Sequence, residues 1–422
     1  MILLESRNYS VHNVREVRGL DERGKKNRQS LFELAMIIYT IKDILEPTEL
    51  FRRPEWLDTL FVLAFLGVIA WKLLLEKYTY LQLVLMVAGA AMCTYTCVKG
   101  NYFYVLISYM CILGVRHVDL QAVMRKVGWI KIVAVGVHVG YYGICRVIMP
   151  SKIHYIWRNG VKRSSFFLSH PNTFSMVVLW ATAALAYGYY KTINRGQIAL
   201  LWGINLFFYC YTNSNTSLMV STIIYGLMLL DKSKVKIDFG LNAAKYVFGM
   251  FSVLIPLFAA AYTRLSGPLL SIYEWLNDFF TGRLLFGSYV YDVYGISWLG
   301  RSLYFPPKIY WHGHWFDEMV FDNAYLWMFV IYGYVYILIL SVAFFLVGRK
   351  ASNLEKIMMI GYSFYGIMEA YILSASHCFP LMFIGLYLYQ WLDRDAKKNK
   401  SKYLEPKLVW KTERSDKHGG ED

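Results

Sequence analysis

Charged side chains are scarce in this chain of 422 residues, at 17% against 57% for hydrophobic ones. Acidic residues are the rarer kind, 29 against 44 basic, so the formal net charge is +15. With a mean hydropathy of +0.35, this composition argues against a soluble protein and predicts an all-α polytopic integral membrane protein. A membrane β-barrel does not fit, because the apolar runs are continuous and do not alternate.

Several motif classes are missing as well. No Walker, Rossmann or zincin pattern occurs, and the first 30 residues lack the apolar core expected of a cleavable signal peptide. The six cysteines lie in or beside apolar runs, which is typical of small core residues. His312 and His314, with Asp317 nearby, resemble a metal site only loosely. We therefore expect neither a metal nor another cofactor.

The apolar runs predict about 12 transmembrane helices with both chain ends in the cytoplasm. In order, the expected spans are 31–45, 57–75, 79–97, 101–115, 127–149, 166–190, 197–212, 215–230, 244–263, 321–348, 356–375 and 378–392. The first is the weakest, because it is short and contains Glu33 and Lys42. The positive charge then favours anionic lipid head groups or an anionic lipid-linked substrate as partners, and nucleic acid is the weaker interpretation.

These spans divide the chain into five parts. Residues 1–30 form a basic cytoplasmic tail, 31–264 hold the first nine spans, and 265–320 form a large extracytoplasmic loop. Residues 321–392 hold the last three spans, and 393–422 form a charged cytoplasmic tail. Every expected inner connection is basic, as the positive-inside rule requires.

Two expected outer connections break that rule, because both are rich in basic residues. They are 150–165, with Lys152, Arg158, Lys162 and Arg163, and about 264–320, with Arg264, Arg283, Arg301 and Lys308. The long connection is also rich in aromatic and aliphatic residues, so we expect it to fold onto the membrane surface. Its arginines either contact lipid head groups or bind an anionic substrate on that face.

A histidine directly before a proline opens the central apolar run. Pro171 precedes about 20 residues without a charge, the length of one span. Proline is favoured at the first helical position and pushes the preceding residue out of helical geometry. His170 is therefore expected at the mouth of a membrane helix, beside N–H groups that can bind an anion. A plain capping role explains His170 equally well.

Other polar groups fall at the same depth in this topology. They are the turn Thr212–Ser217, the pair Asp322–Asn323, His377, and Glu369 about two helical turns below the end of its span. A carboxylate at that depth is costly unless it is paired or hydrated. Asp322 could instead be a helix cap, and Glu369 could pair with a neighbouring tyrosine or histidine. Together the groups predict a polar pocket at the outer surface.

Four of these segments, in order, resemble those of Wzy-type O-antigen and capsular polysaccharide polymerases. They are Arg163-Ser-Ser-Phe-Phe-Leu-Ser-His170-Pro-Asn-Thr-Phe174, the polar turn Thr212–Ser217, Thr281-Gly-Arg283 with Tyr291–Gly300, and Phe321-Asp-Asn-Ala-Tyr325 with Tyr332-Gly333. The chain departs from the family pattern at Asn215, where many members have arginine, and at Leu168-Ser169, where Phe-Gly is common.

The resemblance implies a metal-independent, inverting membrane glycosyltransferase with a bundle similar to the GT-C class. It would join oligosaccharide repeat units carried on undecaprenyl pyrophosphate, as donor and acceptor, at the outer face of the bacterial plasma membrane. Membrane lipids, a chain-length regulator and a flippase would be its partners. A ligase that moves the glycan to another acceptor, and a flippase for the same lipid-linked unit, are the alternatives.

The resemblance also implies roles for individual residues. His170 is the candidate base, and Asp322 either orients it or replaces it. Arg163 and Arg283 are the candidates that stabilise the leaving pyrophosphate. The further substrate-binding candidates are Arg158, Arg264, Asn172, Asn323, Glu369 and His377.

Overall fold

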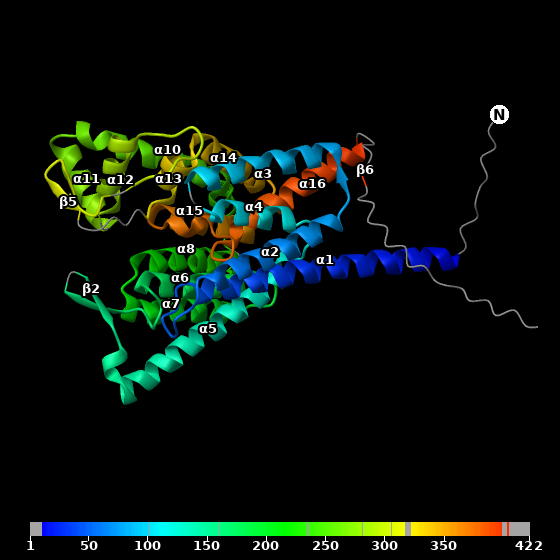
Figure 1. Cartoon of the computed structure of the whole chain (residues 1–422), viewed down its shortest axis with the longest axis horizontal. Coiled ribbons are helices and arrows are strands. Elements are labelled where there is room, and N and C mark those ends of the chain that lie inside the picture. Colours follow the sequence, from blue (N-terminus) through cyan, green and yellow to red (C-terminus); the bar gives the residue numbers. More distant parts are fainter. Residues whose placement is uncertain are drawn as a thin grey trace, which may run out of the picture.

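The computed structural model describes residues 11–100, 102–158, 160–233, 235, 237–280, 282–304, 306–316, 322–398 and 403–404. Most of this part of the chain is helical, with three small two-stranded sheets (Figure 1). The two basic tails expected at the chain ends extend into residues 1–10 and 405–422, outside the described residues.

The α-helices are α1 Val11–Leu45, α2 Trp56–Leu74, α3 Tyr80–Gly100, α4 Tyr104–Gly114, α5 Leu120–Ile148, α6 Pro171–Gly188, α7 Arg195–Thr212, α8 Asn215–Lys232, α9 Asp238–Asn242, α10 Ala244–Ala261, α11 Pro268–Phe279, α12 Arg283–Tyr294, α13 Ala324–Trp327, α14 Tyr334–Gly348, α15 Asn353–Met368 and α16 Phe383–Lys398. The antiparallel strand pairs are β1 Tyr78–Thr79 with β6 Tyr403–Leu404, β2 Tyr155–Arg158 with β3 Val161–Ser164, and β4 Ile309–Trp311 with β5 His314–Phe316. Short 3-10 turns lie at Pro150–Lys152, Tyr262–Arg264, Ala370–Leu373 and Phe379–Met382, and a π turn lies at Met328–Tyr332.

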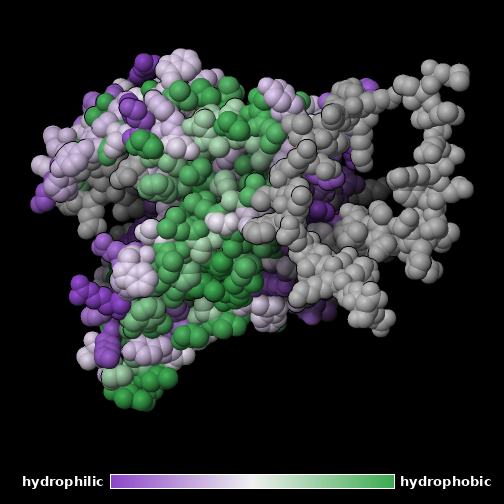
Figure 2. Space-filling model, turned by 45° about the vertical axis from the view of Figure 1, so that its right-hand side comes forward, coloured by the Kyte–Doolittle hydropathy of each residue, from purple (hydrophilic) through white to green (hydrophobic). Residues whose placement is uncertain are grey.

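Four helices are long and apolar enough to cross a membrane: α2, α3, α5 and α10 with the turn that follows it. Helices α4 and α14 are apolar but shorter. Hydrophobic side chains gather over the middle of the face in Figure 2, with hydrophilic ones beyond them. These features are those of a helical membrane protein, whose exposed apolar belt replaces the polar surface of a soluble one.

The two ends of the molecule differ in what they carry. The described start of α1 and the end of α16 lie at one end, on the right in Figure 1. The hairpin β2–β3, helices α11 and α12, and the hairpin β4–β5 lie at the opposite end. The basic segment before His170 and the long connection after α10 therefore lie at the same end of the bundle.

Helix α6, which begins directly after His170, lies at the centre of its half of the bundle. Every residue from Phe174 to Gly188 is buried, and α6 packs against α5, α7 and α8. Pro171 stands at its first turn and His170 at its N-cap, as the His-Pro pair predicts. The core of the protein thus holds His170 in a fixed place at the end of a fully enclosed helix.

Two expected spans have a different form in the structure. The first, 31–45, is the last part of α1, a single helix of 35 residues that is about 52 Å long at 1.5 Å per residue. The span expected at 321–348 is broken: α13 and a π turn end at Gly333, whose φ is +100°, and α14 begins after it. Residue 321 lies outside the described part.

At this break, residues from an earlier segment donate hydrogen bonds to the backbone carbonyls. The Arg301 side chain donates to the carbonyl of Val330 at 2.8 Å, and its backbone N–H donates to Ile331 at 2.9 Å. Ser297 N–H donates to the carbonyl of Phe329 at 3.2 Å. Irregular backbone at membrane depth is tolerated only when such partners replace water.

The spans expected at 356–375 and 378–392 also differ. Helix α15 ends at Met368, and a buried irregular segment, 369–382, leads to α16. Glu369 is the C-cap of α15, so it is not two turns inside a helix as expected. Hydropathy alone does not separate a buried irregular segment from a span, which is why the sequence predicted helix here.

Candidate functional site

The hairpin β2–β3 carries the two arginines that precede His170. Arg158 pairs with Val161 next to the turn, and Ile156 pairs with Arg163. Gly160 adopts φ +75° in that turn, a conformation that glycine adopts without strain. The hairpin thus presents Arg158 near its tip and Arg163 near its base.

Arg163 is held tightly inside the protein. Its side chain is 1% exposed. Its Nε donates to the carbonyl of Thr212 at 2.6 Å, and its Nη2 donates to Oδ1 of Asn172 at 2.6 Å. Hydrogen bonds from a charged group are strong, so Arg163 ties the hairpin to the first turn of α6 and to the end of α7.

His170 caps α6 through one ring nitrogen. The N–H of Asn172 donates to Nδ1 of His170 at 3.1 Å. Burial, and then the nearby charges of Arg163, Arg158 and Arg283, lower the pKa of His170 to about 4. The ring is therefore neutral at pH 7, and because Nδ1 accepts, Nε2 carries the proton.

Arg283, the first residue of α12, lies between two carboxylates. Its Nη2 donates to Oδ2 of Asp322 at 3.0 Å and lies 3.5 Å from Oε1 of Glu369. The side chains of Arg283 and Glu369 are 9% and 6% exposed, and that of Asp322 is 19% exposed. One guanidinium therefore serves two acids from separate segments.

The two carboxyls differ in their protonation. Burial, and then the negative charge of Asp322, raise the pKa of Glu369 to about 8. Burial also raises the pKa of Asp322, but the adjacent Arg283 opposes that shift. Two close acids on one cation share a proton, and Glu369, the more buried, is the one that keeps it at neutral pH.

These groups form one cluster, named here the arginine–carboxylate cluster: Arg158, Arg163, His170, Arg283, Asp322 and Glu369. Burial is the main cause that lowers the pKa of Arg158. The charges of Arg283, Asp322 and Glu369 also act on it, so these groups lie near Arg158. Within the described residues Arg158, which is half-buried, makes no hydrogen bond through its side chain. The structure thus brings together all four residues predicted as catalytic.

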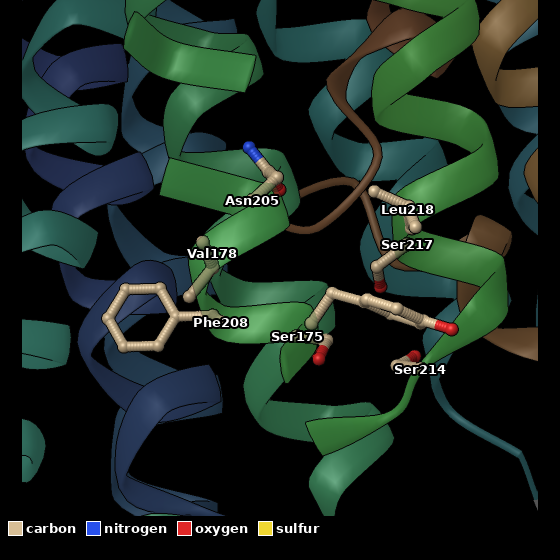
Figure 3. Close-up of a pocket in the computed structure, with 8 residues that line it drawn as sticks. Ser175, Val178, Asn205, Phe208, Ser214, Ser217 and Leu218 are labelled. Atoms are coloured by element: carbon tan, nitrogen blue, oxygen red, sulfur yellow. The ribbon is translucent and has the colours of Figure 1, made fainter. Parts of the chain in front are cut away.

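The polar turn between α7 and α8 borders this cluster. Ser175 donates to Oγ1 of Thr212 at 2.7 Å, and the side chain of Thr216 lies close enough to Glu369 to lower the pKa of that carboxyl. Figure 3 shows an adjoining pocket between α6, α7 and α8, with Ser175, Ser214 and Asn205 on its lining. The pocket has no room for a water molecule, and its lining holds none of the three arginines. The pocket therefore flanks the cluster and is not part of it.

Three other predicted binding residues lie elsewhere or are engaged in packing. Arg264 is exposed in the turn after α10. Asn323 caps α13 and donates from Nδ2 to the carbonyl of Ile367 at 2.9 Å. His377 lies in the segment 369–382, with Nδ1 at 2.9 Å from Ser374 Oγ and 3.3 Å from Asp43 Oδ2.

The partners of His377 were not predicted from the sequence. Asp43 of α1 and Lys131 of α5 are both buried, and Lys131 donates to the carbonyl of Ser376. Both residues lie inside apolar segments, and an ionisable residue there is a signal of function or pairing. This signal could have placed them beside the irregular segment.

No group of three or more His, Cys, Asp or Glu side chains that could hold a metal ion occurs in the part of the chain that the structure describes. Asp317 lies outside that part, and Nε2 of His314 is 2.9 Å from the hydroxyl of Tyr262. No family model, curated protein or solved structure matches this chain.

Proposed function

We propose that this protein is an inverting membrane glycosyltransferase that joins undecaprenyl-pyrophosphate-linked oligosaccharide units into a polysaccharide at the outer face of the plasma membrane. The observation that carries the proposal is the arginine–carboxylate cluster, in which three arginines, from β2, β3 and α12, lie near a neutral histidine and two acids. The 12 spans, the GT-C-like bundle and the extracytoplasmic position of 265–320 belong to the same proposal.

The arginines suit the leaving group of such a reaction. A guanidinium stays charged and binds phosphate oxygens through paired, charge-assisted hydrogen bonds. Arg158 is the first choice as a pyrophosphate ligand, because Arg163 already donates to Thr212 and Asn172. Arg283 orients Asp322 through Nη2, and its charge lies near that of Arg158, so it adds positive charge where the pyrophosphate would bind.

Asp322 suits the role of base better than His170 in this arrangement. Nδ1 of His170 already accepts the N–H of Asn172, and its Nε2–H is a donor. His170 would then donate to the phosphate oxygen that gains charge as the bond breaks, while Asp322, ion-paired with Arg283, accepts the proton of the acceptor hydroxyl. A positioned base contributes about 10²–10⁴-fold in rate.

The proposed step balances without a cofactor. The acceptor hydroxyl oxygen forms a bond to the anomeric carbon of the donor, and its proton passes to the Asp322 carboxylate. The bond between the anomeric carbon and the phosphate oxygen breaks, and undecaprenyl pyrophosphate leaves with the electron pair. Attack opposite the leaving group inverts the anomeric centre.

Reconstitution of the protein in vesicles with the lipid-linked repeat unit tests this function. The expected products are ladders of joined units, whose anomeric configuration is opposite to that of the donor linkage. The variants Arg283→Ala and His170→Ala should make no long chains while inserting normally, and Lys308→Ala, an exposed cation of the same outer region, should behave as wild type.

Two results would reject the proposal. Movement of the unit across the bilayer without a new glycosidic bond would make the protein a transporter, and transfer only to a different acceptor would make it a ligase. Normal chain lengths in both the Arg283→Ala and His170→Ala variants would reject the site.

A further inference from the structure

Helix α11 has three distinct faces at helical spacing. Large apolar side chains are exposed on the first: Leu269 is 62% exposed, Ile272 55% and Trp275 65%. Tyr273 and Asn277 lie on a second face that packs against the protein. Residues three and four apart share one side of a helix, so the exposed apolar side chains form a continuous stripe.

The third face of α11 is polar. Ser271, Glu274 and Asp278 are all exposed, and at 100° per residue they occupy one sector apart from the apolar stripe. Helix α11 therefore meets the protein on one face. Its apolar exposed face and its polar exposed face suit two different environments. Water suits Glu274 and Asp278, and it does not suit the stripe of Leu269, Ile272 and Trp275.

The packed face fixes the direction of the other two. The hydroxyl of Tyr273 is 2.7 Å from Oγ of Ser288 in α12, and the N–H of Leu285 donates to Oδ1 of Asn277 at 2.9 Å. Helix α11 therefore cannot roll about its axis to bury the stripe against α12. The stripe therefore stays on the outside of the folded protein.

We propose that the apolar stripe of α11 lies in the outer leaflet of the same membrane that α10 crosses. Helix α10 has its own exposed apolar side chains, with Tyr246, Val253 and Leu257 more than half exposed, and it is one of the four helices that can span the bilayer. Only residues 262–267 separate the two helices. An amphipathic helix next to a span lies in the plane of the interface, with its apolar face about 5–10 Å below the head groups.

Arg264 fits this arrangement. It is exposed in the turn between α10 and α11, the corner where the chain leaves the bilayer core. An arginine at that level keeps its aliphatic stem in the apolar layer and its charge among the phosphates. Its exclusion from the arginine–carboxylate cluster is thus explained by contact with lipid, independently of the proposed reaction.

Spin labels on two faces of α11 test the proposal. The background is Cys210→Ser, because Cys210 is exposed and the other five cysteines are buried. Ile272→Cys and the matched control Glu274→Cys are labelled in phosphatidylcholine–phosphatidylglycerol vesicles. The label at 272 should collide more with oxygen, which concentrates in lipid, and less with a water-soluble nickel chelate than the label at 274.

Two outcomes would overturn the interfacial position. Equal access of the nickel chelate to both labels would place the stripe in water. Shielding of the label at 272 from both reagents would mean that a second copy of the chain or another protein covers it. If labelling disturbs the fold, Trp275→Phe supplies a second measurement: quenching of tryptophan emission by brominated phosphatidylcholine should fall, and an unchanged degree of quenching counts against lipid contact.

Discussion

Substitution by methionine should have different effects at the two arginines of the hairpin β2–β3. It should lower stability at Arg163 and abolish polymer synthesis at Arg158. In Arg163→Met, the bonds to the carbonyl of Thr212 and to Asn172 are lost. A hydrogen bond from a charged group is worth about 1.5–3 kcal/mol, so the loss is about 3–6 kcal/mol before the new apolar side chain repacks. In Arg158→Met, no side-chain hydrogen bond to a described residue is lost, so stability should be unchanged.

Thermal unfolding in lipid nanodiscs at one fixed scan rate measures this difference. At about 2–4 °C per kcal/mol for a domain of 150–250 residues, Arg163→Met should lower the unfolding temperature by about 6 °C or more. The Arg158→Met variant should unfold at the wild-type temperature and yet make no long polymer, since Arg158 is the arginine proposed to meet the pyrophosphate.

A comparable fall in the unfolding temperature of Arg158→Met would refute the division of roles, because it would show that Arg158 also holds the fold together. The same is true if Arg163→Met is as stable as wild type. Full polymer synthesis by a stable Arg158→Met variant would instead remove Arg158 from the proposed site and leave the structural role of Arg163 intact.

Two further substitutions probe buried groups. Burial raises the pKa of Glu369 to about 8, so the folded state holds its proton more tightly than the unfolded chain does. The stability from this proton is full below about pH 4.5 and is lost as the pH rises through 8, by no more than about 5 kcal/mol. Glu369→Gln should therefore unfold with less pH dependence than wild type between pH 6 and 9, and parallel curves would contradict this. Gly333→Ala should destabilise by about 1–3 kcal/mol from backbone strain alone, since φ is +100° and its Cβ would lie 2.4 Å from the carbonyl oxygen of Trp298; an unchanged unfolding temperature would mean that the break relaxes.

The end of the bundle where the polar groups gather could be predicted from the sequence. The His-Pro pair places His170 at a helix start, and the end of one apolar run and the start of another place Thr212 and Asp322 near it. The positive-inside rule identified Arg163 and Arg283 as arginines that need a reason. These predictions rely on local chemistry and on charge, which short segments carry by themselves.

The pairing within the cluster could not be predicted in the same way. That Arg283 meets both Asp322 and Glu369 depends on α15 ending at Met368, and an apolar run does not reveal where a helix stops inside a protein. The break at Gly333 is equally hidden from the sequence, because the residue that leaves no room for a side chain there is the distant Trp298. Such tertiary contacts override the local signal.

The segment that donates hydrogen bonds to the carbonyls of the broken helix precedes that helix in the chain. Residues 295–301 precede 324–333, so a ribosome releases the donors before it releases the carbonyls that they serve. The later segment can therefore meet its hydrogen-bond donors as soon as it is made. Cutting out residues 295–301 would therefore leave the carbonyls of Phe329, Val330 and Ile331 without these donors.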